Sequence, residues 1–189
     1  MKDVSFVAEK LQASGAVGVI PTDTVYGIVA RAHDESAVQR LYQLKYRESK
    51  PGTIIAANIE QLEALGLKRR YLTVVEQYWP GEVSVVIPCG DPKLAYLHQG
   101  VMSLAVRIPS VEELLRLLEQ TGPLLTSSAN HPQQSTAVTI DQAKTYFVDT
   151  VDFYADGGDL SSKKPSTIIR VVDDAIEVLR QGAVIIKED

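Results

Sequence analysis

Polar side chains recur two or four residues apart near the ends of segments that are otherwise apolar. The sets are Thr22 with Thr24 and Tyr26, Lys45 with Arg47, Ser103 with Arg107, and Ser128 with Asn130. Side chains two apart on an extended segment project to the same face. Arginine and lysine neutralise phosphate or carboxylate oxygens, and serine, threonine and asparagine supply short hydrogen bonds. Together these sets favour the binding of an anionic, hydroxyl-rich ligand.

Each set alone also has an ordinary structural explanation. Lys45 and Arg47 fit a solvated helix end, where cations complement the helix dipole. Ser128 and Asn130 fit a turn and a helix N-cap, and residues 22–26 fit an edge strand. No single set therefore decides between ligand binding and local structure.

Arg107 is the hardest of these residues to explain without a ligand, because residues 102–108 are apolar apart from Ser103 and Arg107 itself. A guanidinium group in such a strand must find an anion or a carboxylate. A bound anion satisfies this need, and so does an internal partner such as Asp156.

The segments that must position these side chains alternate between helical and strand patterns. Helices are predicted near residues 5–13, 60–65, 71–78, 110–120 and 139–146, with a further helix beginning at residue 34. Strands are predicted near residues 16–20, 53–57, 83–88, 103–108, 123–127, 151–154, 167–172, 176–179 and 184–186. This pattern indicates an α/β protein with a parallel or mixed sheet, treated as one domain over residues 1–189. In such sheets ligands bind outside the carboxyl ends of strands.

Composition narrows the class of protein further. The 189 residues are 45% hydrophobic and 23% charged, with a net charge of −5. These values exclude a disordered or coiled-coil chain and argue against a general nucleic-acid coat protein. One cysteine cannot form an internal disulfide, and no apolar run approaches the roughly 18 residues of a membrane span. We therefore expect a cytoplasmic protein with no membrane partner.

Several common catalytic motifs are missing from the sequence. It contains no phosphate-binding P-loop, no G-x-G-x-x-G fingerprint and no G-x-S-x-G nucleophile elbow. The three histidines are far apart, and none pairs with a carboxylate at helical spacing. No protein-held metal site is predicted.

Eight short motifs, read in order, resemble the YrdC-like family, and within it the short, single-domain threonylcarbamoyl-AMP synthases. They lie at residues 21–27, 45–47, 79–81, 104–107, 128–130, 156–158, 165–168 and 179–182. The resemblance implies a single-domain twisted open mixed sheet with flanking helices and a large concave basic face. It also implies that L-threonine, bicarbonate and ATP, with Mg²⁺ bound mainly through phosphates, give threonylcarbamoyl-AMP and pyrophosphate. A separate complex would then transfer the threonylcarbamoyl group to tRNA, with at most a weak tRNA contact by this chain.

The resemblance also assigns roles to individual residues. Those expected to hold threonine are Thr24, Arg107, Ser128 and Ser166, with Arg107 taking the carboxylate. Those expected to hold the nucleotide are Arg47, Lys50, Ser103, Asn130 and Arg180. Those expected to act directly in catalysis are Lys45, Arg47, Ser128 and Asn130. Departures from the family pattern at Glu48, Glu82 and residues 131–134 concern loops more than this pocket.

Two other functions stay open at this stage. The same basic concavity could hold an RNA backbone, as in a ribosome-associated module, and such binding would weaken steeply with salt. A YciO-like paralogue would share the fold but have a different activity. Retention of the Lys-x-Arg and Ser-x-Asn motifs favours the synthase over the paralogue.

Overall fold

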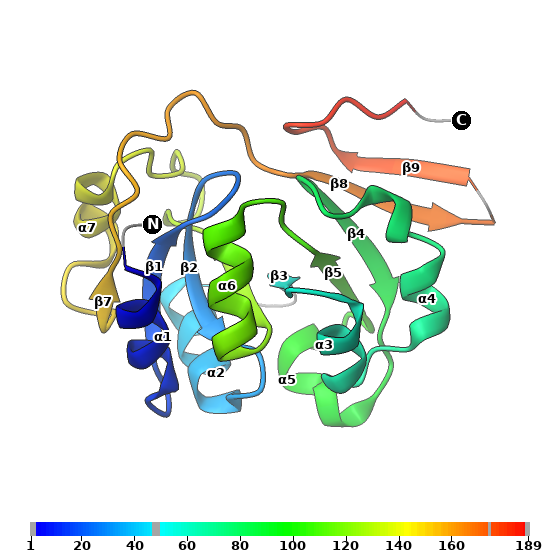
Figure 1. Cartoon of the computed structure of the whole chain (residues 1–189), viewed down its shortest axis with the longest axis horizontal. Coiled ribbons are helices and arrows are strands. Elements are labelled where there is room, and N and C mark those ends of the chain that lie inside the picture. Colours follow the sequence, from blue (N-terminus) through cyan, green and yellow to red (C-terminus); the bar gives the residue numbers. More distant parts are fainter. Residues whose placement is uncertain (1–2, 47–49, 174, 188–189) are drawn as a thin grey trace.

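One mixed sheet organises the part of the chain that the computed structural model describes, which is residues 3–46, 50–173 and 175–187 (Figure 1). The strands are β1 (Val17–Pro21), β2 (Tyr26–Arg31), β3 (Thr53–Ile55), β4 (Val83–Pro88), β5 (Ser103–Arg107), β6 (Leu124–Ser128), β7 (Phe153–Tyr154), β8 (Thr167–Val172) and β9 (Ala175–Arg180). Their order in the sheet is β7-β1-β2-β6-β3-β5-β4-β8-β9. The pairs β1–β7, β3–β5 and β4–β8 are parallel, and the other pairs are antiparallel.

Short helices flank this sheet. They are α1 (Val4–Gln12), α2 (Glu35–Leu44), α3 (Ile59–Ala64), α4 (Arg69–Thr73), α5 (Ala95–His98), α6 (Glu112–Thr121) and α7 (Ile140–Phe147), with 3₁₀ turns at Glu76–Tyr78 and Pro92–Leu94. Asp3, Asp34, Asn58 and Thr139 cap α1, α2, α3 and α7 by accepting a backbone N–H. Among the described residues, no helix combines the length and apolar character needed to cross a membrane.

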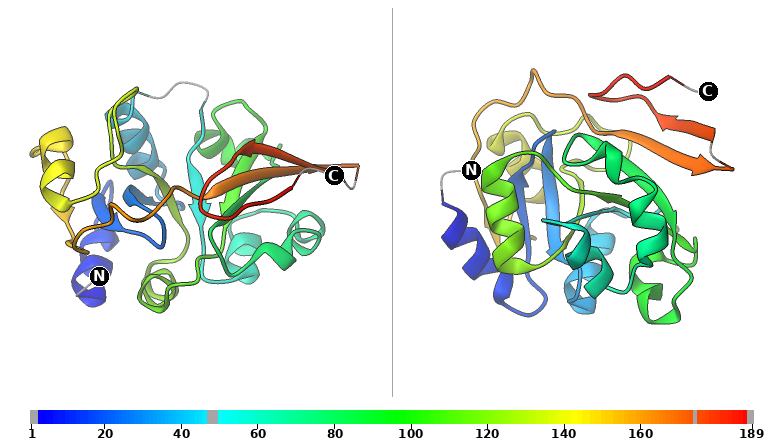
Figure 2. Two further views of the ribbon diagram at one scale, coloured as in Figure 1. Left: turned by 90° about the horizontal axis from the view of Figure 1, so that it is seen from above. Right: turned by 45° about the vertical axis from the view of Figure 1, so that its right-hand side comes forward.

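Alternation along the strands divides the buried core between the two faces of the sheet. Ile54 and Leu125 belong to the larger apolar cluster, which α2, α5 and α7 help to form. Their neighbours Ile55 and Leu124 point the other way and join the smaller cluster with α1 and α6. Figure 2 shows α6 beside α1, with α2 across the sheet. The remainder of the face that α1 and α6 share carries polar side chains instead.

The predicted fold class and most predicted elements are confirmed. Strands β4 and β8 have the predicted bounds, and most other elements differ by one to three residues. The single helix predicted at residues 71–78 is wrong, because α4 ends at Thr73 and a 3₁₀ turn follows. Residues 184–186 form no strand, and the sequence analysis missed β2 and α5.

Two predictions that rested on extended backbone are also wrong. Residues 22–25 form a turn in which the Thr22 hydroxyl accepts the N–H groups of Thr24 and Val25, at 3.2 Å each. Tyr26, which begins β2, is therefore in the core rather than on the side that Thr22 and Thr24 share. Lys45 is the C-cap of α2 and has helical dihedral angles, so strand alternation does not apply to it.

Candidate active site

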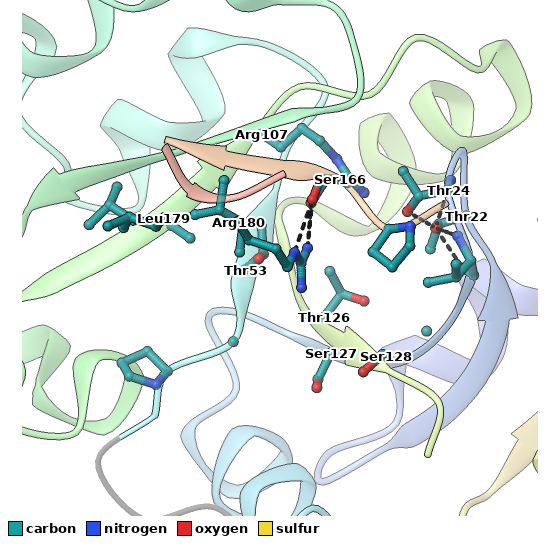
Figure 3. Close-up of a pocket in the computed structure, with 18 of the residues that line it drawn as sticks. Thr22, Thr24, Thr53, Arg107, Thr126, Ser127, Ser128, Ser166, Leu179 and Arg180 are labelled. Carbon is teal, nitrogen blue, oxygen red and sulfur yellow. Dashed lines mark hydrogen bonds between the residues drawn. The ribbon is translucent and has the colours of Figure 1, made fainter. Parts of the chain in front are cut away.

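A cleft of about 470 Å³ lies on the polar part of the sheet face that α1 and α6 partly cover. Six of the predicted site residues line it: Thr24, Ser103, Arg107, Ser128, Ser166 and Arg180. They come from the turn after β1, from β5, β6 and β9, and from the segment before β8. Figure 3 shows five of these side chains, with Arg180 reaching toward Ser166 and with Thr24 beside Thr22. Residues distant in sequence therefore meet in one hollow.

Arg107, at the end of β5, is held by a buried ion pair. Its Nη2 donates to Oδ1 of Asp23 at 2.9 Å, and the two side chains are 4% and 0% exposed. Burial lowers the pKa of Arg107, an effect that the Asp23 carboxylate opposes. The prediction of Asp156 as the internal partner of Arg107 is wrong, because Asp23 takes this place. Asp156 accepts hydrogen bonds from Tyr26 Oη and the Gly158 N–H instead.

Ser166 and Arg180 contact each other directly across the cleft wall. Arg180 Nη2 donates to the Ser166 carbonyl oxygen at 2.8 Å and to Ser166 Oγ at 3.1 Å, as the dashed lines in Figure 3 mark. The Ser166 hydroxyl also pairs with Oγ of Ser84, a fully buried residue on β4, at 2.9 Å. Ser84 and Arg180 together fix where Ser166 presents its hydroxyl.

Three other predicted residues line an adjoining hollow of about 850 Å³ rather than the cleft itself. These are Lys45, Lys50 and Asn130, and Ser128 lines both spaces. Lys45 is buried, and its Nζ donates to Ser128 O at 2.7 Å, to Asn130 Oδ1 at 2.9 Å and to the Asn130 carbonyl oxygen. Ser128 Oγ donates to the same Asn130 Oδ1 at 2.7 Å. Lys45 thus fastens the end of α2 to the Ser-x-Asn turn.

Arg47, predicted to bind the nucleotide and to act in catalysis, lies outside the described residues. Its role stays a prediction. The described residues on either side of it, Lys45, Tyr46 and Lys50, line the adjoining hollow.

Several cleft residues were not predicted from the sequence, and three of them are threonines. Thr53, Thr126 and Thr136 line the cleft, as do Gly27 and Arg170. The signal for Thr126 was present, because it precedes Ser128 by two residues on β6 and so shares its face. Thr53 pairs with Thr126 across neighbouring strands, and only the strand order reveals this contact.

The cleft lining is cationic, and none of the described residues that form it is acidic. Two of its arginines have carboxylate partners, since Arg107 pairs with the buried Asp23 and Arg170 pairs with the exposed Glu177. Within the described residues, no cluster of three or more His, Cys, Asp or Glu side chains could hold a metal ion. Hydroxyl and guanidinium donors suit oxyanions of a ligand better than a bare cation.

The sequence of the chain also matches a known protein family and several of its members. Residues 10–182 match the family model Sua5_yciO_yrdC, which is described as telomere recombination. The chain belongs to the Sua5/YciO/YrdC family. Among its relatives is the threonylcarbamoyl-AMP synthase of Pyrococcus abyssi, 30% identical over 178 residues, with 92% of this chain and 52% of the relative covered. Another is the threonylcarbamoyl-AMP synthase of Pseudoalteromonas translucida, 28% identical, with 89% of this chain and 94% of the relative covered.

A solved structure in this family has the same fold. It is P. abyssi Sua5 complexed with L-threonine, with a TM-score of 0.82 and 29% identity, covering 95% of this chain and 54% of that chain. The present chain spans about half the length of the P. abyssi relative. The family and the fold of this chain follow from these matches.

Proposed function

We propose that this chain is an L-threonylcarbamoyladenylate synthase, a nucleotidyltransferase that joins L-threonine, bicarbonate and ATP. The products are threonylcarbamoyl-AMP and pyrophosphate. The observation that carries the proposal is the convergence of Thr24, Arg107, Ser166 and Arg180 in one cleft without acidic lining. The names of the P. abyssi and P. translucida relatives, and the threonine in the solved neighbour, support it.

The two substrates take opposite sides of this cleft in the proposed complex. Arg107, with Thr24 beside it, binds the threonine carboxylate, and Ser128 and Ser166 hydrogen-bond the rest of the amino acid. Arg180 and Ser103 contact the nucleotide. Because Arg180 touches Ser166, the amino acid and the α-phosphate are brought close to each other.

The chemistry needs positioning and charge stabilisation, with no covalent nucleophile on the protein. The neutral amine of threonine attacks the carbon of bicarbonate, and loss of water leaves a carbamate. A carbamate oxygen then attacks the α-phosphorus of ATP, and the bond to pyrophosphate breaks. Positioned cations such as Arg180 stabilise the charge that develops on the phosphate oxygens.

Mg²⁺ enters this proposal as part of the nucleotide, where it would neutralise phosphate charge. The cleft supplies hydroxyl and guanidinium groups, which suit a metal held by phosphates and water rather than by protein carboxylates. The product would pass in the cytoplasm to a separate complex that modifies tRNA, and any contact of this chain with tRNA would be weak.

The test is pyrophosphate release by the purified full chain with ATP, Mg²⁺, bicarbonate and L-threonine. We expect release that requires both threonine and bicarbonate, with threonylcarbamoyl-AMP identified by mass spectrometry. Omission of threonine, or of bicarbonate in a degassed buffer, supplies the control. Pyrophosphate release that is indifferent to threonine would overturn the proposal. Tight RNA binding without turnover would favour the RNA-binding module instead.

A further inference from the structure

Asp23 has no place among the residues expected to bind substrate, although it lies beside Thr24 in the turn after β1. It does not line the cleft, and only 1% of it is exposed. Its Oδ1 accepts the hydrogen bond from Arg107 across 84 residues of sequence. This carboxylate is therefore the internal contact that joins the turn carrying Thr24 to the strand carrying Arg107.

The ion pair between Asp23 and Arg107 is incompletely satisfied. Asp23 Oδ2 and Arg107 Nε are both buried, and neither has a hydrogen-bond partner among the described residues. Burial raises the pKa of Asp23, and the charge of Arg107 acts against that rise. A buried pair with unmet hydrogen bonds contributes little net stability, because desolvation offsets the Coulombic attraction. A contribution to the free energy of folding therefore does not by itself explain why the Asp23–Arg107 ion pair is present.

The geometry gives the pair a different role. One Nη2–Oδ1 bond restricts the rotation of the guanidinium group, while Arg107 still lines the cleft. Because Asp23 and Thr24 are adjacent, the same bond sets the position of Thr24 relative to Arg107. We propose that Asp23 is a positioning residue that holds Arg107 and Thr24 at the spacing needed for an amino-acid carboxylate.

This inference rests on the proposed function, since it concerns the same threonine site. It predicts that Asp23 affects the affinity for threonine through Arg107 and does not affect the affinity for ATP. In Asp23→Asn the carboxylate charge is lost while the shape is kept. The KM for threonine should rise about tenfold, the loss expected for one charged hydrogen bond. The KM for ATP and kcat at saturating threonine should stay within about twofold of wild type.

Two further variants separate positioning from folding. Asp23→Glu keeps the charge and should restore part of the threonine affinity lost in Asp23→Asn. Asp152→Asn is the matched control, because Asp152 pairs with Arg40 at 2.6 Å and neither residue lines the cleft. Its KM for threonine should equal that of wild type. Thermal unfolding of every variant reports any loss of structure.

The outcomes distinguish this inference from the proposed function. Threonine-dependent turnover in the wild type, with an unchanged KM for threonine in Asp23→Asn, overturns the inference alone. An equal rise in the KM values for threonine and ATP, in step with a lower melting temperature, also overturns it. No threonine-dependent turnover in a folded wild type overturns both. A rise confined to threonine, with recovery in Asp23→Glu, supports the positioning role.

Discussion

Arg180 donates hydrogen bonds to both oxygen atoms of Ser166, one on the backbone and one on the side chain. In the proposed complex Arg180 serves the nucleotide and Ser166 serves threonine. This contact therefore joins the two halves of the site. Any energetic coupling between the two substrates through it must be reciprocal.

Arg180→Ala should weaken the binding of both substrates for this reason. We expect the KM for ATP and the KM for threonine each to rise about tenfold, since a charged hydrogen bond is lost on both sides. A double-mutant cycle with Ser166→Ala should give a coupling energy of about 1 kcal/mol or more. The control is Arg116→Ala, at an exposed position of α6, which should leave both KM values unchanged. Because Ser166→Ala keeps the backbone carbonyl, strict additivity of the two variants would show that the contact of Arg180 with Ser166 Oγ is energetically silent.

Lys45 and Lys50 should respond differently to the same substitution. Lys45→Met removes the hydrogen bonds that the buried ammonium group donates to oxygens of Ser128 and Asn130, so urea unfolding should show a loss of about 2–3 kcal/mol. Lys50 is exposed, and Lys50→Met should change the unfolding free energy by less than about 0.5 kcal/mol while raising the KM for ATP. If Lys45→Met lost turnover but kept full stability, Lys45 would be acting on the substrate instead.

The hydroxyl group of Thr126, which lines the cleft, can be tested for a contribution to activity. It is 7% exposed, lines the cleft and stands next to Gly27, where an added Cβ would lie 2.6 Å from Thr126 Oγ1. Thr126→Val keeps the shape and removes the hydroxyl, so we expect kcat/KM for threonine to fall about fivefold or more. Thr126→Ser keeps the hydroxyl and should retain most activity. Equal losses in the two variants would point to packing of the methyl group.

Stability should depend on pH through Asp34, the N-cap of α2. Burial raises the pKa of this carboxyl group, but hydrogen bonds from Ser36, Ala37 and Gly15 outweigh it and leave the pKa below its ordinary value. The carboxylate therefore stabilises the fold above its unfolded-state pKa, and this contribution is lost as the pH falls through the folded-state pKa.

The variant Asp34→Ala should accordingly lower the unfolding free energy by about 1 kcal/mol at pH 7. The difference from wild type should begin to shrink near the ordinary aspartate pKa of about 3.9, where the carboxyl group of the unfolded chain takes up a proton, and should disappear below the lower folded-state pKa. Urea unfolding at a series of pH values measures both. A difference that stays constant down to pH 3 would assign the loss to packing rather than charge.

Patterns within short segments of the sequence correctly predicted the features that depend on residues close together in the chain. Ser103 and Arg107 share a face of β5 that is opposite the buried Leu104 and Val106, as the alternation indicated. The need of Arg107 for a buried partner also followed from its type and its surroundings. The choice of Asp23 over Asp156 did not, because it depends on how the turn after β1 folds across β5.

The same limit explains the other errors. Residues 22–26 read as a continuous strand, yet the hydroxyl of Thr22 closes a turn there, and side-chain capping of this kind competes with strand geometry. Lys45 was expected on an extended segment together with Arg47, but the helical backbone geometry of α2 continues through Lys45. Thr53 becomes a cleft residue only because β3 inserts between β5 and β6.

The order of the strands in the sheet affects how the chain folds during translation. Strands that are neighbours in space are separated in the chain, and β8 with β9, near the carboxyl end, complete the wall that holds Ser166 and Arg180. Pairing of distant segments is slow, because each closure must overcome loop entropy first. A nascent chain in which β9 has not yet been translated lacks Arg180, so the wall of its cleft is incomplete.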